Sequence, residues 1–238
     1  LNFGNIYNGG GVATADFNND GLVDVFFVAN QNSNKLYLNK GDFKFDDVTN
    51  TSGLEDAKGW STGVSVVDIN NDGWLDIYIS KSGSRSANGL RENKLFVNQK
   101  NNTFIDKAKA WKINDPGFST QSYFFDFDKD GDLDMYLVNH RPDFENTGKL
   151  NMRIEREYSR FSSDILYRND GTHFTEITHD AGLVNKTWGL SASIGDFNND
   201  GWQDIYVCND FLTPDKLYIN NKNGTFTNEI SDRIKHIS

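Results

Sequence analysis

Four short segments of the chain carry carboxylate or amide side chains at every second position, followed by a glycine. They begin at Asp16, Asp68, Asp126 and Asp196 and have the sequences DFNNDGLVD, DINNDGWLD, DFDKDGDLD and DFNNDGWQD. Oxygen ligands with this spacing, and a glycine at the sixth position that permits a sharp turn, can wrap a hard cation of the size of calcium. The four copies therefore predict four Ca²⁺ sites, one in each loop.

Each predicted site takes side-chain oxygens from positions one, three, five and nine of its loop and the backbone carbonyl of position seven. The side-chain ligands are Asp16, Asn18, Asp20 and Asp24 in loop one, Asp68, Asn70, Asp72 and Asp76 in loop two, Asp126, Asp128, Asp130 and Asp134 in loop three, and Asp196, Asn198, Asp200 and Asp204 in loop four. The carbonyl ligands are those of Leu22, Trp74, Asp132 and Trp202. No ligand is His or Cys, which disfavours zinc and copper.

Loop three differs from the others because Asp128 stands where they have asparagine. Since the number of ligand charges tunes calcium affinity, loop three is expected to bind most tightly. The alternative for any of the loops is an Asx-turn that side-chain to backbone hydrogen bonds hold without a metal.

The loops are not EF-hands, which need a bidentate glutamate at position twelve and a helix on each side. Position twelve is Phe27, Ile79, Leu137 or Val207. The segments on both sides of each loop are short and rich in β-branched and aromatic residues, which is typical of strands. Each loop is therefore predicted to join two antiparallel strands.

A second phrase follows each loop and extends the repeat. It reads NKLYLNKGDFKFDDVT from Asn34, NKLFVNQKNNTFIDKA from Asn93, DILYRNDGTHFTEIT from Asp164 and DKLYINNKNGTFTNEI from Asp215, which predicts two further strands and a tight turn. Four antiparallel strands in each repeat predict an all-β fold of β-propeller blades, with approximate bounds 1–53, 54–111, 112–182 and 183–238 in a single domain. A β-sandwich or an open β-array with the same strands is the alternative.

These phrases, together with YNGGGVATADFNNDGLVDVFF and STQSYFFDFDKDGDLDMYLVNHR, resemble the FG-GAP/VCBS-type calcium propeller repeats, which are also found in integrin α-subunit heads. The likeness to integrins concerns the fold and the metal loop only. Within that group they are similar to the branch typified by cartilage acidic protein and its UnbV/ASPIC-containing relatives. The resemblance covers essentially the whole chain, although the literal Phe-Gly and Gly-Ala-Pro signatures are mostly missing. It implies a propeller of about seven blades, of which these four would be a part of a longer chain.

The net charge is −10, from 34 acidic and 24 basic residues, which disfavours a nucleic-acid partner. Most of the regular acidity is accounted for by the predicted calcium ligands. The chain has a single cysteine, Cys208, in an apolar strand, and no segment of the length and apolarity of a transmembrane helix. Loops of modest calcium affinity suit a calcium-rich environment, so a secreted or cell-surface location is expected.

Two functions fit this scaffold. The first is a non-catalytic adhesion module that binds a protein or a glycan, and the second is a polysaccharide lyase or hydrolase on a calcium propeller. No Gly-x-Ser-x-Gly, His-Glu-x-x-His or phosphate-binding loop occurs. The remaining catalytic candidates are His140, Arg141 and Asp143, for which a satisfied loop cluster is the alternative.

The segments between the second and third strands of each repeat differ most in length, and the longest is Asn139–Asp164. Because variable loops on a rigid scaffold often carry function, this insert is predicted to be the main partner surface. Its segment LNMRIEREYSRF predicts a short helix, which could instead cap the blade. At the entry to the first strands, Tyr7, Trp60, Phe118 and Trp188 are predicted to pack between blades.

Overall fold

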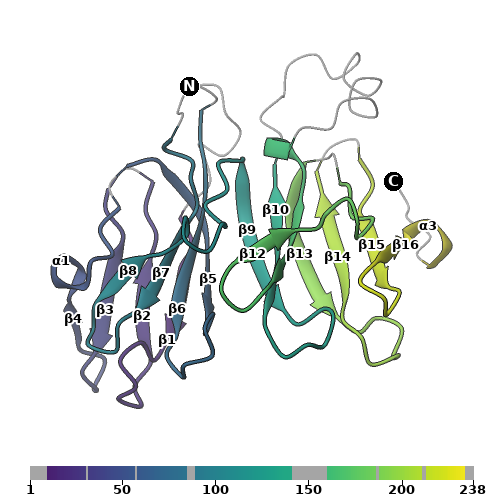
Figure 1. The fold of residues 1–238 in the computed structure, drawn as a ribbon. Coiled ribbons are helices and arrows are strands. Elements are labelled where there is room, and N and C mark those ends of the chain that lie inside the picture. Colours follow the sequence, from purple (N-terminus) through teal and green to yellow (C-terminus); the bar gives the residue numbers. More distant parts are fainter. Residues whose placement is uncertain are drawn as a thin grey trace. The chain divides into compact units, whose positions relative to one another are not determined.

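The computed structural model of the chain describes residues 10–30, 32–56, 58–84, 89–140, 160–185, 188–210 and 213–233. These residues form four separate sheets, each of four antiparallel strands, which confirms the predicted all-β class and the four propeller-type blades (Figure 1). In every sheet the strands lie side by side in chain order, so each blade is a simple meander.

The strands of the first two blades are β1 (Val12–Ala15), β2 (Asp24–Phe27), β3 (Lys35–Asn39) and β4 (Phe45–Asp47), then β5 (Trp60–Val67), β6 (Asp76–Ser82), β7 (Lys94–Asn98) and β8 (Phe104–Asp106). Those of the other two are β9 (Ser119–Phe125), β10 (Asp134–Asn139), β11 (Ile165–Asn169) and β12 (Phe174–Glu176), then β13 (Gly189–Gly195), β14 (Asp204–Asn209), β15 (Lys216–Asn220) and β16 (Phe226–Asn228). Each of the four predicted metal loops (16–24, 68–76, 126–134 and 196–204, called the metal loops below) therefore joins the first strand of its blade to the second, as predicted.

Helical structure among the described residues is limited to single turns. They are α1 (Thr49–Ser52), α3 (Ile230–Arg233) and the 3₁₀ turn η2 (Arg160–Ser162). The sequence does not predict α1 or α3, because four residues are too few to show a helical period. The helix predicted within Asn139–Asp164 lies mostly outside the described residues, which resume at Arg160.

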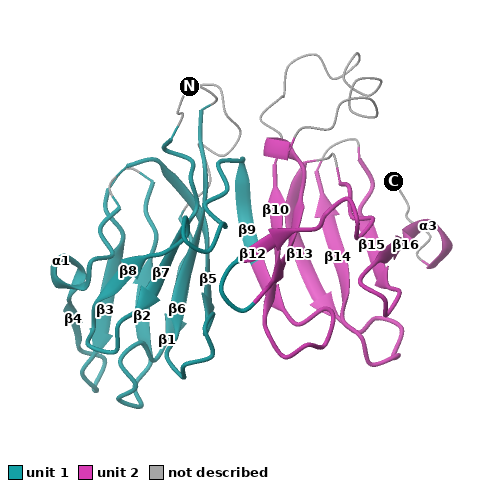
Figure 2. Cartoon of the chain, in the orientation of Figure 1, with its two compact units in different colours: residues 1–122, 171–173 teal, residues 123–170, 174–238 magenta. Residues whose placement is uncertain are grey.

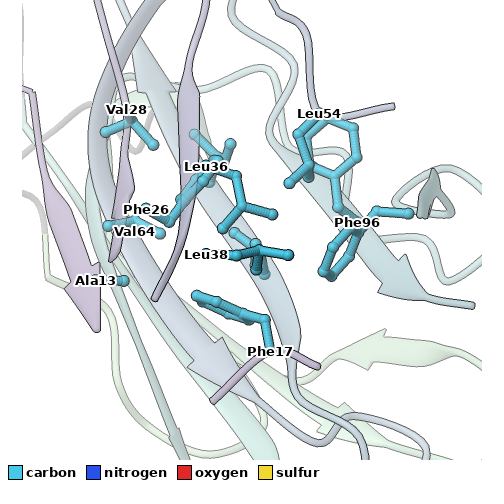
Figure 3. Packing of buried hydrophobic residues seen from close by; sticks show 12 residues of the cluster. Ala13, Phe17, Phe26, Val28, Leu36, Leu38, Leu54, Val64 and Phe96 are labelled. Carbon is cyan, nitrogen blue, oxygen red and sulfur yellow. The ribbon is translucent and has the colours of Figure 1, made fainter. Parts of the chain in front are cut away.

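The chain divides into two compact units (Figure 2). One comprises residues 1–122 with 171–173, and the other comprises 123–170 with 174–238. In the first unit, Phe26 and Leu36 of blade one share a buried cluster with Ile77 and Ile79 of β6 (Figure 3). Cross-strand neighbours such as Phe26 and Leu36 point to the same face because side chains alternate along a strand.

The second unit has an equivalent core between its own two blades. Tyr136 and Val138 of β10 pack with Ile205 and Val207 of β14. At the loop end of this core the rings of Phe127 and Phe226 lie 5.9 Å apart. The second residue of a metal loop therefore anchors that loop in the packing between two blades.

The aromatic residues predicted at the strand entries fit this scheme where they are described. Phe118 and Trp188 are buried, and Trp60 is half-buried. Trp188 forms a β-bridge with His140, which connects the end of β10 to the start of β13. Tyr7 lies outside the described residues. Among the helices in the described ranges, none is long and apolar enough to cross a bilayer.

Candidate metal centre

Loops one, two and four share one hydrogen-bonded conformation. In loop two, Asp68 accepts the backbone N–H of Asp72 at 2.9 Å through Oδ1 and that of Gly73 at 2.8 Å through Oδ2. Asp16 and Asp196 accept the corresponding N–H groups in loops one and four. The sixth-position glycine has φ of +82° in loop two, which favours glycine over any residue with a side chain.

The third and fifth positions of these loops also bond to each other. Nδ2 of Asn70 donates to Oδ2 of Asp72 at 3.1 Å, and the other carboxylate oxygen of Asp72 accepts the N–H of Trp74 at 3.0 Å. The same pairs recur in loops one and four. In these three loops, donors of the chain itself therefore contact both oxygens of the first and fifth aspartates.

Loop three is different because Asp128 has no amide hydrogen to donate. Asp126, Asp128 and Asp130 each offer a carboxylate oxygen, and these oxygens all lie within 4.8 Å of one another. Oδ1 of Asp126 is buried, and no hydrogen-bond partner for it lies among the described residues. Burial and the neighbouring Asp130 raise the pKa of Asp128 above its ordinary value.

The donor set of loop three fits a hard cation. Three converging carboxylates are the ligands that Ca²⁺ prefers, and a buried carboxylate oxygen without a donor is costly unless a cation or hydrogen bond compensates it. Asp126, Asp128 and Asp130 could hold the ion directly. Asp132, whose carbonyl was assigned as a ligand, follows the glycine turn, and its N–H is bonded to Asp130 at 3.0 Å.

The ninth-position aspartates have a further role that the sequence analysis missed. Oδ2 of Asp134 accepts the N–H of Phe127 at 3.1 Å, and Oδ1 accepts the N–H of Asn169 at 2.8 Å. Asp24, Asp76 and Asp204 make the same two bonds in their blades. Each of these buried carboxylates thus fastens its loop to the end of the third strand.

Burial raises the pKa of the ninth-position carboxyl groups, although the two backbone hydrogen bonds that each accepts act in the opposite direction. The pKa of Asp76 is about 6 and that of Asp134 is about 8. Asp134 is not one of the three acids that converge in loop three. A carboxylate has about four lone-pair sites, so two backbone bonds leave capacity for a metal, and the ligand role of position nine stays a prediction.

An asparagine at the end of each third strand completes the arrangement. In blade two, Nδ2 of Asn98 donates to the carbonyl of Phe17 in loop one at 2.8 Å. In the second unit, Asn220 donates to the carbonyl of Phe127 in loop three at 2.8 Å. The last residue of the phrases NKLYLN, NKLFVN, DILYRN and DKLYIN is asparagine in every repeat, which is the signal that could have identified it.

A lysine reaches the metal loop in two blades. Nζ of Lys100 lies 3.2 Å from Oδ2 of Asp72, and Nζ of Lys222 lies 3.2 Å from Oδ2 of Asp200. Both lysines are in the turn between the third and fourth strands, so only the register of the two hairpins places them beside the fifth position. The sequence alone does not predict this contact.

Neighbouring loops within a unit also touch through the fourth position. Nδ2 of Asn19 in loop one donates to the carbonyl of Gly73 in loop two at 3.2 Å. In the second unit, Nζ of Lys129 in loop three lies 4.6 Å from the ring centroid of Trp202 in loop four.

The opposite end of each blade carries a second set of buried polar side chains. Oδ1 of Asp164 accepts the backbone N–H of Asn139 at 2.8 Å. Its Oδ2 accepts the hydroxyl of Tyr136 at 2.8 Å and the side-chain amide of Asn185 at 2.6 Å. Asn93 holds the same place in blade two, where it contacts Lys81 and Tyr78. Burial raises the pKa of Asp164 to about 6.

The catalytic candidates are only partly described. His140 is buried, and its Nδ1 lies 3.3 Å from the carbonyl of Gly189. Burial also lowers its pKa. Arg141 and Asp143 lie outside the described residues, as does most of the Asn139–Asp164 insert. The described surroundings of His140 are those of a structural contact between β10 and β13.

Comparison with known proteins gives two findings. The family model of the FG-GAP-like repeat matches residues 16–79, 158–207 and 196–236, which is more than half of the chain. Human cartilage acidic protein 1 is 25% identical over 228 residues, which cover 93% of this chain and 31% of the human protein. The mouse protein is 24% identical over 225 residues, covering 92% and 32%, respectively.

A third relative, cartilage acidic protein 1 of Xenopus tropicalis, is 29% identical over 136 residues, or 57% of this chain and 20% of the frog protein. The chain thus spans about a third of the length of the human and mouse relatives. Loop three lies outside the ranges that the family model matches.

Proposed function

Because the chain belongs to the FG-GAP-like repeat family, we propose that it is a calcium-stabilised, non-catalytic module that binds a protein or a glycan outside the cell. The observation that carries the calcium assignment is the buried, unpartnered Oδ1 of Asp126 beside Asp128 and Asp130. A hard cation in loop three would compensate this oxygen and the repulsion among the three carboxylates.

Calcium at loops one, two and four is the second part of this proposal. Their carboxylates have the same spacing, but each site is already held by hydrogen bonds of the chain. An ion there has to displace the bond between the third-position amide and the fifth-position carboxylate. These three sites are therefore expected to bind calcium more weakly than loop three.

The experiment is calcium titration of the metal-free protein by calorimetry, with thermal unfolding in calcium and in chelator. A ligand that binds only the native state raises its stability by RT ln(1 + [L]/Kd), so Tm should increase with calcium concentration. Asp126→Asn should abolish the tightest site, while Asp106→Asn, an exposed acid on β8, should leave it unchanged. Equal calcium binding by Asp126→Asn and the parent protein would refute the assignment of loop three.

The extracellular location is proposed on two grounds. The predicted calcium sites need a medium in which calcium is plentiful, and the similarity to cartilage acidic protein 1 covers nearly the full length of this chain. Secretion of a tagged full-length protein by its native host, followed by immunodetection in medium and cell fractions, tests it directly.

The partner surface is proposed at the strand-two-to-strand-three end of blade three, where the Asn139–Asp164 insert leaves β10. Asp164 and η2 secure the return of the insert, since Arg160 bonds to Glu176 at 2.9 Å. A deletion of residues 143–158 across a Gly-Ser bridge leaves these contacts in place. The deletion should retain calcium binding and lose binding to the oligosaccharides that the parent protein binds on an array of neutral and anionic glycans.

The alternative function is a polysaccharide lyase or hydrolase that uses the same scaffold. The buried position of His140 does not favour it. Incubation with the polysaccharides bound on the array, followed by measurement of new reducing ends and of absorbance from unsaturated products, separates the two functions.

A further inference from the structure

We propose that Lys100 and Lys222 are tethered counter-cations that lower the calcium affinity of loops two and four, and so divide the four loops into two classes. The inference rests on the calcium function proposed above and deepens it. It starts from one juxtaposition that occurs twice: a lysine ammonium 3.2 Å from Oδ2 of the fifth-position aspartate.

The two lysines occupy equivalent places in their hairpins. Lys100 follows the end of β7 by two residues, and its N–H is bonded to the side chain of Asn98 at 2.9 Å. Lys222 follows β15 in the same way and bonds to Asn220 at 2.9 Å. Both have φ of +64°, a left-handed conformation that lysine seldom adopts. The backbone therefore aims both side chains in the same direction, toward the loop of their own blade.

The contacted oxygen is one that calcium would need. Oδ2 of Asp72 accepts a hydrogen bond from Nδ2 of Asn70 at 3.1 Å and lies 3.2 Å from Nζ of Lys100, while Oδ1 accepts the N–H of Trp74. A calcium ion at this site must share the carboxylate with the ammonium or displace it. In both cases a positive charge stands within a few ångströms of the ion and repels it.

Loops one and three lack this lysine. The residue two positions after the third strand is Gly41 in blade one and Gly171 in blade three. Loop three has a lysine of its own, Lys129, but its ammonium lies over the Trp202 ring in loop four. The proposed classes are therefore loops one and three, whose hairpins have glycine at this position, and loops two and four, whose hairpins place a lysine beside the fifth-position aspartate.

The test uses terbium, a luminescent substitute for calcium, because loops two and four each contain a tryptophan at position seven. Light absorbed by Trp74 or Trp202 sensitises terbium bound in the same loop. In a Trp202→Phe background the signal reports loop two, and Trp74→Phe provides the blank. Lys100→Met should tighten terbium and competing calcium binding about three- to tenfold at physiological ionic strength.

Three controls separate a local effect from a general one. Lys94→Met removes a lysine at the start of β7 that pairs with Asp106, and so matches the change in net charge. Lys100→Arg keeps the positive charge. The effect of Lys100→Met should shrink to less than about twofold in 0.5 M salt, where the Debye length is short.

The reciprocal variant installs the counter-cation in loop one. A side chain at Gly41 meets no atom within 4 Å of its Cβ, although φ is +79°. In a background that carries Leu22→Trp together with Trp74→Phe and Trp202→Phe, the signal reports loop one. There, Gly41→Lys should weaken terbium binding about three- to tenfold relative to Gly41→Met, which carries the same backbone strain.

The outcomes are distinct. Tighter binding by Lys100→Met alone, with weaker binding by Gly41→Lys, supports the proposal. If Lys100→Met and Lys94→Met have the same affinity as the parent, the counter-cation role is refuted while calcium binding stands. If the parent protein binds neither terbium nor calcium, the proposed function fails and this inference fails with it.

Discussion

Loops two and three have nearly the same sequence pattern, but they differ in how far hydrogen-bond donors and cations of the chain compensate their carboxylates. In loop two the amide of Asn70 and the ammonium of Lys100 both contact Asp72, so its negative charge is compensated by the chain. In loop three the exchange of that amide for Asp128 leaves three carboxylates together and a buried oxygen of Asp126 without a donor. Loop two is stabilised by contacts within the chain, whereas the carboxylates of loop three are arranged in a way that suits a bound cation.

The two loops are nevertheless attached to their blades by the same hydrogen bonds. Asp76 and Asp134 each join the loop to the third strand through two backbone N–H groups. The comparison teaches that the repeat has two separable layers, a buried layer that fixes the fold and an outer layer that sets affinity for a cation.

The largest effect is expected from removal of the buried carboxylates. Asp76→Ala and Asp134→Ala each leave two backbone donors without an acceptor, which should lower the free energy of unfolding by about 3 kcal/mol or more. Denaturant unfolding in chelator measures both, with Asp46→Ala, a substitution of an exposed acid on β4, as control. A marked difference between the two losses would show that the buried layer is not equivalent in the two blades.

The second effect concerns the opposite ends of the same blades, where Asp164 in blade three corresponds to Asn93 in blade two. Burial raises the pKa of Asp164 to about 6 from 3.8, so the folded state holds this proton more tightly than the unfolded state. Its contribution is fully present below about pH 4 and is lost as pH rises through about 6.

Asp164→Asn should remove that pH dependence. The difference in free energy of unfolding between pH 4.5 and pH 8 should be smaller in the variant by roughly 2–3 kcal/mol. The comparison of variant and parent at each pH cancels the other buried aspartates. The same slope in both proteins would mean that Asp164 is ionised in the folded state throughout this range.

A third pair of substitutions exchanges the character of the two loops. Asp128→Asn should restore the amide bond to Asp130 and stabilise the metal-free protein by about 1 kcal/mol, while weakening calcium binding. Asn70→Asp should do the reverse in loop two. Calorimetric titration and chelator-state unfolding measure the two effects separately, and a change of the same sign in both variants would contradict the comparison.

The smallest effect is expected from the contact between Lys129 and Trp202. A double-mutant cycle of Lys129→Met and Trp202→Leu should give a coupling energy of about 0.5–1 kcal/mol. Lys109→Met, which replaces an exposed lysine after β8 in the first compact unit, serves as the uncoupled control. Zero coupling would leave Lys129 available to compensate the acids of its own loop and would weaken the contrast with loop two.

The sequence determined much of the fold. The glycine at the sixth position and the apolar residue at the twelfth, such as Ile79 or Leu137, predicted a loop between strands instead of a helix–loop–helix, and the structure has that arrangement in all four blades. Periodicity and turn chemistry are local properties, so the sequence displays them directly. The single turns α1 and α3 were not predicted because they are too short to produce a period.

The sequence predicted which residues form the candidate site, but not the contacts that those residues make with other strands. The alternating spacing predicted that Asp126, Asp128 and Asp130 converge, and their carboxylates do so in the structure. In a tight loop, residues that are close in sequence are also close in space. Spacing could not show that Asp134 is buried and bonded to Asn169, or that Lys100 reaches Asp72, since both contacts join separate hairpins. Strand register and burial decide which donors and charges each carboxylate meets, and these belong to the tertiary structure alone.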